Sequence, residues 1–245
     1  MSHISVDIKN VTFAYEKSKP VLSDISFHVG ENESVGIIGA NGAGKSSLLK
    51  LIVGLYTDYE GCIRVEDIPV EHRTLALIRE KVGYVFQNSD SQLFMSNVYD
   101  DVAFAPRNYG LSEEETDKRV KSALERVGAL DLIDRHIYKL SGGEKKLVSI
   151  ATILSMIPDI ILMDEPSAAL DPRNRRNLIK LLNSFSHLKI IASHDLDLIM
   201  DTCKRTILIS EGVVVADDDT RTILTDEKLL EKHGLELPLF LYNNR

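Results

Sequence analysis

The order of apolar and polar positions divides the chain into segments of different character. Apolar and polar residues alternate over ISVDIKNVTFAY (4–15) and VLSDISFHV (21–29), which is the two-residue period of half-buried strands. The next run, SVGIIGA (34–40), is apolar without alternation, as expected of a strand covered on both faces, and a glycine-rich turn and a helical pattern follow it. We therefore expect an antiparallel sheet first, and then a strand, a loop and a helix in that order.

The middle of the chain differs from the segments on either side. Residues 112–128 and 143–157 carry apolar positions at helical spacing, which predicts two amphipathic helices. Apolar strands at 159–164 and 188–193, each followed by a helical pattern, then restore the alternation of strand and helix that is typical of a parallel sheet. A hairpin over 207–218 and a helix over 225–234 are predicted to end the chain.

Together these segments predict an α/β fold with a parallel core sheet, an N-terminal antiparallel β subdomain and an inserted helical subdomain. We assign residues 1–87 and 159–245 to the core with its antiparallel subdomain, and residues 88–158 to the helical insertion. The chain has 245 residues, 44% of them hydrophobic and 27% charged. This composition supports a folded core and excludes disorder as the main state.

Charge and cysteine content exclude several function classes. The 29 Lys and Arg residues against 37 Asp and Glu give a net charge of −8, which repels phosphate backbones, so we expect no nucleic-acid partner. Cys62 and Cys203 belong to no CxxC or Cys/His cluster and are interpreted as small buried hydrophobes. Because no window approaches the roughly 18 apolar residues that a membrane span needs, we expect a cytosolic chain that reaches a membrane only through a partner.

The glycine-rich segment 39–46, GANGAGKS, matches the pattern GxxxxGK[ST] between a predicted buried strand and a predicted helix. Backbone N–H groups of such a loop can surround phosphate oxygens at the positive end of the helix. Lys45 would add a charge at the β and γ phosphates of ATP, and Ser46 a hydroxyl ligand for Mg²⁺. The alternative is a turn that merely caps a helix. The predicted nucleotide-binding residues here are Gly39, Asn41, Gly42, Gly44, Lys45, Ser46 and Ser47.

Two acidic residues, Asp164 and Glu165, stand at the end of the predicted strand 159–164, directly after its apolar residues 160–163 and at the edge where parallel sheets place their ligands. Asp164 is predicted to hold Mg²⁺ opposite Ser46, and Glu165 to orient or deprotonate the attacking water. Taken alone, acids after a strand are more often solvated strand ends, but the glycine-rich loop in the same chain favours the functional interpretation. The combination predicts a P-loop NTPase.

A second potential anion site lies at Leu140–Glu144, the sequence LSGGE, at the start of a predicted helix. Ser141 is a plausible N-cap, and Gly142 and Gly143 expose backbone donors. By itself this segment would be only a helix cap. If one γ phosphate is bound by both anion sites, two chains arranged head to tail with two-fold symmetry satisfy both sites at once.

The LSGGE segment between a P-loop and an acidic pair makes the chain similar to the nucleotide-binding subunits of ABC transporters. This resemblance implies roles for Tyr15 in stacking on adenine, Gln87 in linking Mg²⁺ to a membrane partner, and Asp171 in coupling two sites. It also implies that His194 contacts the γ phosphate. The alternatives are a sheet-covering Tyr15, a polar strand terminus at Gln87, a helix N-cap at Asp171 and a structural or solvent-facing His194.

Within the family, residues 85–94 and 101–106, together with SGGEKK and EKHGLELP, are similar to energy-coupling-factor and cobalt-type importer ATPases. Two positions depart from the pattern: Leu147 stands where the family usually has arginine, and Ser89 where the subgroup usually has proline. The resemblance implies an ATPase that dimerises on ATP, either as a homodimer or with a homologous ATPase subunit. It would power a membrane importer of a vitamin or a transition-metal ion.

The same resemblance implies integral membrane transporter subunits as partners and a peripheral location on the cytoplasmic face of the cell membrane. We expect the segment Asn88–Phe94, with an exposed Leu93 and Phe94, either to dock a helix of such a partner or to belong to the core. Alternatives are an ATPase of another ABC transporter class or a P-loop small-molecule kinase. A chromosome or repair ATPase is excluded because the chain between Lys45 and Ser141 leaves no room for a long coiled coil, and a translation factor would normally join two such domains.

Overall fold

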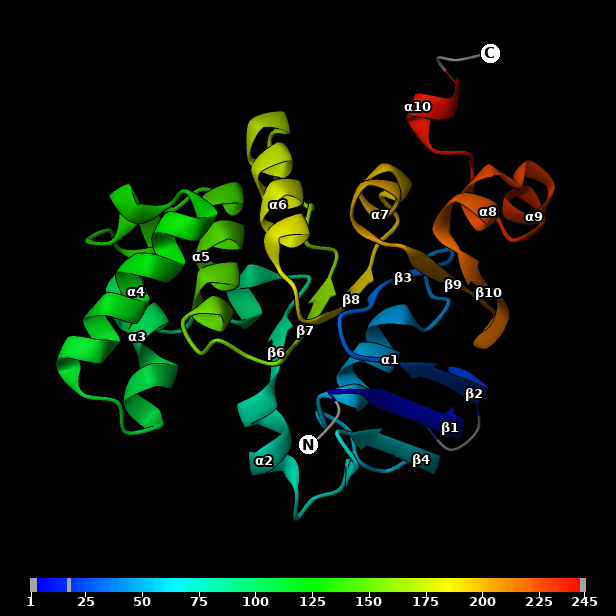
Figure 1. Cartoon of the computed structure of the whole chain (residues 1–245), viewed down its shortest axis with the longest axis horizontal. Coiled ribbons are helices and arrows are strands. Elements are labelled where there is room, and N and C mark those ends of the chain that lie inside the picture. Colours follow the sequence, from blue (N-terminus) through cyan, green and yellow to red (C-terminus); the bar gives the residue numbers. More distant parts are fainter. Residues whose placement is uncertain (1–3, 17–18, 243–245) are drawn as a thin grey trace. The chain divides into compact units, whose positions relative to one another are not determined.

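The computed structural model describes residues 4–16 and 19–242, which form two compact units (Figure 1). The first unit comprises Met1–Val82, Asp159–Glu165 and Ser186–Arg245, and the second comprises Gly83–Pro158 and Pro166–Phe185. The second unit thus contains the segment after the acidic pair in addition to the middle of the chain. The domain boundaries at 87/88 and 158/159 remain a prediction.

The first unit contains the antiparallel sheet that the alternating segments predict. Strands β1 (Val6–Phe13) and β2 (Leu22–Val29) pair antiparallel, and β4 (Glu60–Val65) pairs with the other edge of β1. A two-residue strand, β5 (Ile68–Pro69), completes the order β2-β1-β4-β5. Strands β4 and β5 were not predicted, because their short pattern of alternation is weak without the partner strand beside it.

A mixed sheet forms the core of the first unit and runs β10-β9-β3-β8-β7 within it. Strands β3 (Ser34–Ile38), β8 (Leu188–Ala192) and β7 (Ile160–Asp164) are parallel neighbours, and every residue in them is buried. Strand β9 (Arg205–Ser210) is parallel to β3, and β10 (Val213–Asp219) forms the predicted hairpin with it. The carboxyl ends of β3, β7 and β8 therefore lie at one edge, where the predicted site residues follow each strand.

Short helices accompany these sheets. Helix α1 (Lys45–Ile52) follows β3, α2 (Leu75–Lys81) precedes β6 (Val82–Val85), and α7 (Leu196–Thr202) follows β8. The predicted C-terminal helix is shorter than expected, α9 (Glu227–Lys232), and α8 (Thr220–Thr225) comes directly before it. Asp226 ends α8 and accepts the N–H of Leu229, which separates the two helices.

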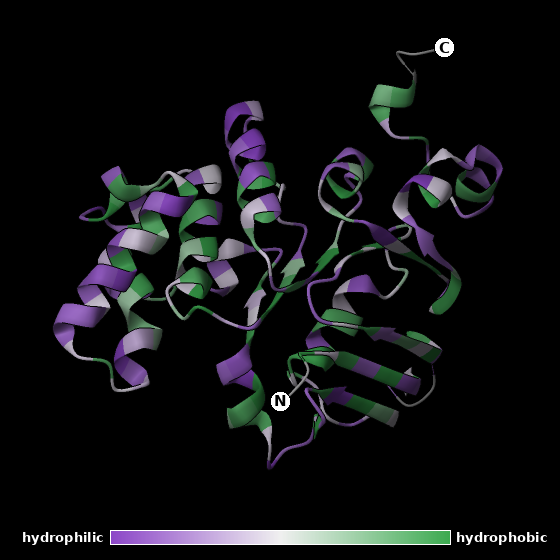
Figure 2. Cartoon of the chain, viewed as in Figure 1, coloured by the Kyte–Doolittle hydropathy of each residue, from purple (hydrophilic) through white to green (hydrophobic). Residues whose placement is uncertain are grey.

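The second unit is mainly helical. Helices α3 (Val98–Asn108), α4 (Glu113–Val127) and α5 (Gly142–Leu154) pack on one another, and α6 (Pro172–Ser184) contacts α4. Figure 2 shows that α4 is largely polar along its visible length, whereas the strands β7 and β8 of the mixed sheet are largely apolar. The helix α3 was not predicted, because Pro106 lies inside it and a proline is unfavourable in the interior of a helix.

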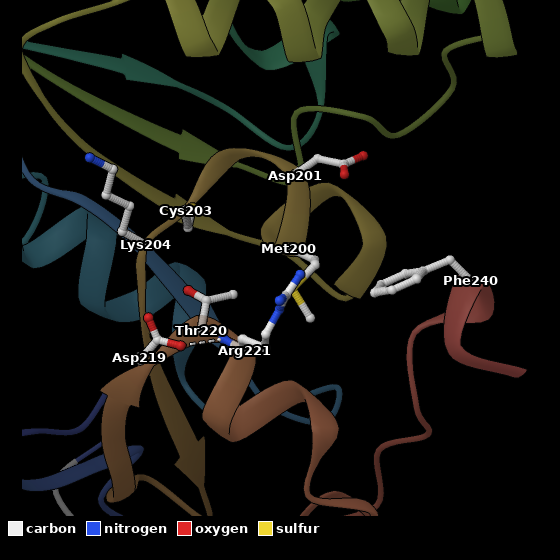
Figure 3. Close-up of a pocket in the computed structure, with 8 residues that line it drawn as sticks. All are labelled: Met200, Asp201, Cys203, Lys204, Asp219, Thr220, Arg221 and Phe240. Carbon is white, nitrogen blue, oxygen red and sulfur yellow. Dashed lines mark hydrogen bonds between the residues drawn. The ribbon is translucent and has the colours of Figure 1, made fainter. Parts of the chain in front are cut away.

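A short terminal helix, α10 (Leu239–Tyr242), is held by α7. The carboxylate of Asp197 accepts the backbone N–H groups of Leu239 and Phe240. Beside it lies a cavity of about 460 Å³ (Figure 3). It is lined by residues of α7, α8 and α10, by Cys203 and Lys204 after α7, and by Asp219 at the end of β10, and none of these is a predicted site residue. None of the helices in the described part of the chain has the length and hydropathy of a membrane-spanning segment.

The two cysteines differ in burial. Cys203 is buried as predicted, and burial raises the pKa of its thiol. Cys62 is only partly buried, so its interpretation as a core residue was wrong. It lies on β4, which has only one strongly paired neighbour, β1, at this position, and the half-covered strand leaves the side chain within reach of solvent.

Candidate nucleotide-binding and hydrolysis site

The loop after β3 owes its shape to glycines that no other residue could replace without strain. Gly39 has a φ of 153°, and a Cβ built on it would lie 2.1 Å from the carbonyl oxygen of Ile209. Gly44 has a φ of 103°, and its Cβ would lie 2.5 Å from Leu22. Helix α1 begins after Gly44, and no side chain caps it. Its first N–H groups, which point toward the loop, are therefore not bonded to a capping side chain and can bind an anion there.

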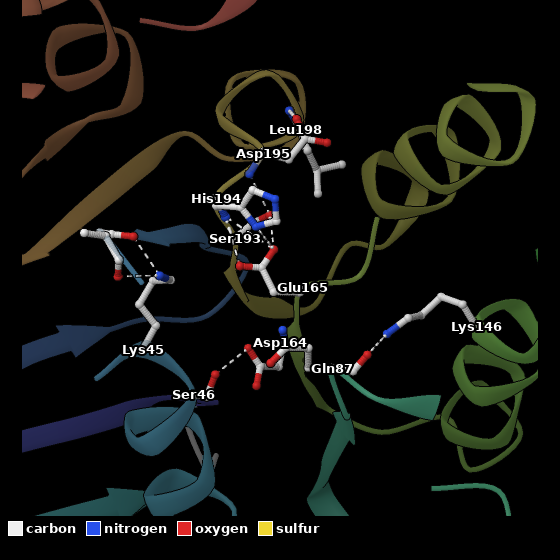
Figure 4. A network of polar contacts seen from close by, with 12 residues as sticks. Lys45, Ser46, Gln87, Lys146, Asp164, Glu165, Ser193, His194, Asp195 and Leu198 are labelled. Atoms are coloured by element: carbon white, nitrogen blue, oxygen red, sulfur yellow. Dashed lines mark hydrogen bonds and ion pairs between the residues drawn. The ribbon is translucent and has the colours of Figure 1, made fainter. Parts of the chain in front are cut away.

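Lys45 is the first residue of α1, and its ammonium group lies within the loop. Its side chain is buried, and Nζ donates hydrogen bonds to the carbonyl oxygens of Gly39 at 2.7 Å and Ala40 at 3.2 Å (Figure 4). Burial lowers the pKa of this amine, while the charges of Glu165 and Asp164 oppose the shift. The arrangement concentrates a cation and backbone donors in one loop, as binding of a polyphosphate requires.

Ser46 and Asp164 converge from α1 and the end of β7. The Ser46 hydroxyl donates to Asp164 Oδ1 at 2.9 Å, and Asp164 is 2% exposed. A hydroxyl and a carboxylate oxygen are the ligand types that Mg²⁺ prefers, and this ion completes its shell with water and phosphate oxygens. No group of three or more His, Cys, Asp or Glu residues that could hold a metal by itself occurs in the described ranges. The donor set therefore fits a magnesium ion that binds together with a phosphorylated ligand.

Glu165 follows Asp164 and adopts a left-handed backbone conformation, with a φ of 48°. The residue is 6% exposed. Three donors lie around it, all from the segment that follows β8. Ser193 Oγ donates to Oε2 at 2.9 Å, the His194 backbone N–H lies 3.1 Å from Oε1, and His194 Nδ1 lies 2.8 Å from Oε2. The side chain of His194 is exposed, in contrast to the carboxylate that it contacts.

Tyr15 lies in a bend two residues after β1, within a cluster of three aromatic rings. Its ring centroid is 5.0 Å from that of Phe13 and 5.3 Å from that of Tyr56, both in edge-to-face geometry. Its hydroxyl forms a hydrogen bond with Ser47 Oγ at 2.9 Å, which connects the ring to α1. The ring is half exposed and held in place, so it offers a platform next to the phosphate loop.

The LSGGE segment belongs to the second unit and forms the predicted start of a helix. Ser141 is the N-cap of α5 and forms a capping box with Glu144, whose carboxylate accepts the Ser141 N–H at 2.7 Å. This hydrogen bond lowers the pKa of Glu144. A Cβ at Gly143 would lie 3.0 Å from the carbonyl oxygen of Ala169, which favours glycine here, whereas a Cβ at Gly142 would be 3.7 Å from Ala169.

Gln87 and Asp171, also in the second unit, are both found at element boundaries. Gln87 lies in a bend two residues after β6 and is exposed. Asp171 is the N-cap of α6, where it accepts the Asn174 N–H at 2.8 Å directly before Pro172. Asp171 is therefore a helix N-cap, as the alternative interpretation expects. A cap does not prevent a coupling role, which remains a prediction.

The segment after Gln87 differs from the prediction at one position. Leu93 is buried, so its predicted exposure was wrong, because the 3₁₀ turn Ser89–Ser91 directs the chain back toward the helices. Phe94 is 63% exposed and packs edge to face with Phe104 of α3 at 4.8 Å. Of the two apolar residues in this segment, only Phe94 thus presents apolar surface.

Comparison with known proteins agrees with this geometry. Residues 22–168 match the protein family described as ABC transporter. The chain belongs to the ABC transporter family. An ABC transporter ATP-binding protein of Geobacter sulfurreducens, named as putative, is 48% identical over 239 residues, which are 98% of this chain and 96% of the relative. The energy-coupling factor transporter ATP-binding protein EcfA of Carboxydothermus hydrogenoformans is 40% identical over 98% of this chain and 89% of its own length.

Solved structures of ABC proteins have the same fold. The protein cbiO1 of Clostridium perfringens, described as part of the ABC transporter complex cbiONQ, is 32% identical with a TM-score of 0.81 and covers 95% of this chain and 94% of its own. The bacterial ABC transporter cassette MJ0796, described as dimeric, is 27% identical with a TM-score of 0.82, over 88% of this chain and 99% of its own. The predicted P-loop ATPase fold is confirmed, and the small-molecule kinase alternative is wrong.

For this ABC ATPase, the sequence patterns missed two polar residues that contact the predicted site. Ser193 is 0% exposed and bonds to Glu165, and Lys146 is 2% exposed and bonds to the backbone of Gln87. Ser193 directly precedes His194 at the end of a predicted strand, a position that could have drawn attention to it. Nothing in the sequence separates Lys146 from the neighbouring Lys145, because only the tertiary structure buries one and leaves the other near the surface.

Proposed function

We propose that this chain is the ATP-hydrolysing subunit of an importer of the energy-coupling-factor or cobalt type, which moves a vitamin or a transition-metal ion. The observation that carries the ATPase function is the convergence of Lys45, Ser46, Asp164, Glu165 and His194 at one edge of the first unit. The similarity to proteins named EcfA and cbiO1 supports the importer class. Its ATPase activity agrees with the family to which it belongs.

In the proposed mechanism, the loop N–H groups and Lys45 bind the β and γ phosphates, with the ammonium exchanging its bonds to Gly39 and Ala40 for phosphate oxygens. Ser46 and Asp164 would hold Mg²⁺, and a bound ion would supply positive charge to the phosphate oxygens. Glu165 accepts a proton from the water that attacks the γ phosphorus, the bond to the ADP oxygen breaks, and His194 donates to a γ-phosphate oxygen. Tyr15 stacks on the adenine.

Dimerisation completes the proposed site. The N-terminus of α5, with Ser141, Gly142 and Gly143, supplies donors to the γ phosphate bound by a second subunit, and Asp171 couples the two sites. The second subunit is either another copy of this chain or a homologous ATPase. The dimeric state described for the structure of MJ0796 supports this arrangement.

The membrane partner is proposed to contact the surface near Gln87 that carries the Phe94 and Phe104 ring pair. An edge-to-face aromatic pair with both rings more than 40% exposed is apolar area that a partner helix could cover. The chain would then lie on the cytoplasmic face of the cell membrane as a peripheral subunit beside integral membrane subunits, with no nucleic-acid partner.

The decisive experiment is the Glu165→Gln substitution. Gln retains the shape and can accept a hydrogen bond from Ser193, but it cannot take a proton from water. We expect ATP binding to persist, phosphate release without any acceptor to stop, and an ATP-bound dimer to accumulate in size-exclusion chromatography. Turnover at the wild-type rate in this variant would contradict the role of Glu165, and absence of phosphate release by the wild type with its membrane partner would contradict the ATPase function.

A further inference from the structure

Lys146 has a position unusual for a lysine on an amphipathic helix. It lies on α5, one turn after the Ser141 cap, and it is 2% exposed although it carries an ammonium group. Its Nζ donates to the carbonyl oxygens of Phe86 at 2.9 Å and of Gln87 at 2.8 Å (Figure 4). Burial of a charge is costly unless hydrogen bonds compensate. The buried ammonium of Lys146 therefore favours a backbone conformation in which the carbonyl oxygens of Phe86 and Gln87 both remain within hydrogen-bond distance.

The two carbonyls belong to consecutive residues, and this is informative about the backbone. In a β-strand, consecutive carbonyls point to opposite sides, so a single ammonium cannot bond to both. The chain leaves β6 at Val85 and bends at Gln87, which turns both oxygens toward Lys146. Lys146 therefore stabilises the bend at Gln87, and this bend sets the position of the Gln87 backbone from which its side chain extends.

A second connection to α5 holds the other side of Phe86. The Phe86 N–H donates to Gln92 Oε1 at 3.1 Å, and Gln92 Nε2 donates to the Ser149 carbonyl at 2.6 Å and to Thr152 Oγ1 at 2.8 Å. The amide and carbonyl of Phe86 are thus both connected to α5. Segment 86–92 and α5 are held together within the second unit by several partly buried hydrogen bonds.

We propose that Lys146 is a positioning residue for Gln87, which makes the segment 86–92 and the helix that begins at Ser141 move as one body. This inference rests on the proposed function, in which Ser141 approaches a γ phosphate in the other subunit, and on the role that the resemblance to ABC ATPases implies for Gln87, linking Mg²⁺ to a membrane partner. A shift of α5 on nucleotide binding by the partner subunit would then change the place of the Gln87 amide. Lys146 would act on Gln87 through the backbone carbonyls of Phe86 and Gln87.

Lys146→Met tests this directly, because Met fills similar space in the buried position and donates no hydrogen bond. Lys146→Arg restores donors that can bond to two carbonyls. The matched control is Lys145→Met on the same helix, whose ammonium pairs at 2.6 Å with the carboxylate of Asp90, a residue whose side chain is 65% exposed. If Lys146→Met does not fold, Lys146→Gln, which retains one donor group, takes its place.

The first measurement is hydrogen exchange of the full-length protein without nucleotide or Mg²⁺. We expect faster amide exchange over residues 86–92 in Lys146→Met and exchange near the wild-type rate in Lys146→Arg. Lys145→Met removes only the ion pair with the exposed carboxylate of Asp90 in the same segment, so it should speed exchange there much less. This readout is independent of hydrolysis. Unchanged exchange in Lys146→Met would overturn the positioning role.

The second measurement is the Mg²⁺ concentration that half-saturates ATP hydrolysis, because loss of a residue that orients a metal ligand commonly weakens metal affinity or activity by roughly 10- to 100-fold. We expect a shift in this range for Lys146→Met, a much smaller shift for Lys146→Arg, and unchanged ATP binding in the presence of EDTA. In a Gln87→Ala background the Lys146→Met substitution should have no further effect, since it acts through Gln87.

The outcomes separate the inference from the proposed function. Fully additive effects of Lys146→Met and Gln87→Ala would reduce Lys146 to a structural residue and overturn the inference, while ATP hydrolysis stands. A wild-type Mg²⁺ requirement in Gln87→Ala would leave nothing for Lys146 to position and would also overturn it. Absence of Mg²⁺-dependent hydrolysis by the wild type would instead refute the proposed function and, with it, the inference that rests on it.

Discussion

The hydroxyl of Ser193 is predicted to hold the carboxylate on which hydrolysis depends, and the Ser193→Ala substitution removes it. Ser193 is 0% exposed, and its Oγ forms two hydrogen bonds. It donates to Glu165 Oε2 at 2.9 Å and accepts the Asp195 N–H at 3.0 Å, at the start of α7. Alanine therefore leaves one carboxylate oxygen and one backbone N–H without this partner, the first at a buried contact and the second at a partly buried one.

The magnitude follows from the two bonds. A hydrogen bond to a charged group contributes about 1.5–3 kcal/mol, and a neutral one about 1 kcal/mol, so Ser193→Ala is expected to lower the free energy of unfolding by about 2–4 kcal/mol. Glu165 retains the His194 N–H at 3.1 Å and Nδ1 at 2.8 Å, so it remains in the site but is less well oriented. If the poorer orientation of Glu165 raises the activation free energy of hydrolysis by about 1.4 kcal/mol, hydrolysis slows roughly tenfold.

Urea denaturation of the full chain measures the free energy of unfolding, and phosphate release at saturating ATP measures hydrolysis. Ser34→Ala is the matched control, since Ser34 is also buried and donates to the Thr202 carbonyl, away from Glu165. The control should lose stability without a change in the rate of hydrolysis. If Ser193→Ala matches the wild type in both measurements, or if Ser34→Ala slows hydrolysis equally, the assignment of Ser193 to Glu165 is wrong.

Further predictions concern the phosphate loop, the dimer and the α5 cap. Gly39→Ala should abolish nucleotide binding, measured with a fluorescent ATP analogue, because its Cβ would lie 2.1 Å from the Ile209 carbonyl oxygen; binding at wild-type affinity would contradict this reasoning. Lys45→Ala and Ser141→Arg subunits, each inactive alone, should regain ATPase activity when mixed, since one composite site then carries neither change; no recovery in demonstrated mixed dimers would count against the shared site. Glu144 has a lowered pKa in the fold, so its contribution to stability is present above its unfolded-state pKa and is lost as the pH falls through its folded-state pKa. Denaturation curves of the wild type and Glu144→Gln should therefore converge in acid, and a constant difference would refute the cap's role.

The sequence by itself determined those elements in which a local physical requirement restricts the residue type, such as burial of a strand on both faces or a positive φ angle in a loop. The apolar runs of β3, β7 and β8 require burial on both faces, so they predicted the central strands and the edge where Asp164 and His194 lie. The positive φ angles of the loop require glycine, so the spacing around Lys45 identified the phosphate loop. These constraints are local, and one strand or one loop is sufficient to express them.

Only the tertiary structure decided which of two similar residues becomes buried and what it contacts. Lys145 and Lys146 are adjacent and chemically identical, yet one pairs with exposed Asp90 and the other bonds to carbonyls of Phe86 and Gln87. The burial of Leu93 beside exposed Phe94 likewise depends on a 3₁₀ turn and on helices distant in the sequence. The physical reason is that burial and hydrogen-bond partners arise from segments that meet only in the fold, so no local pattern records them.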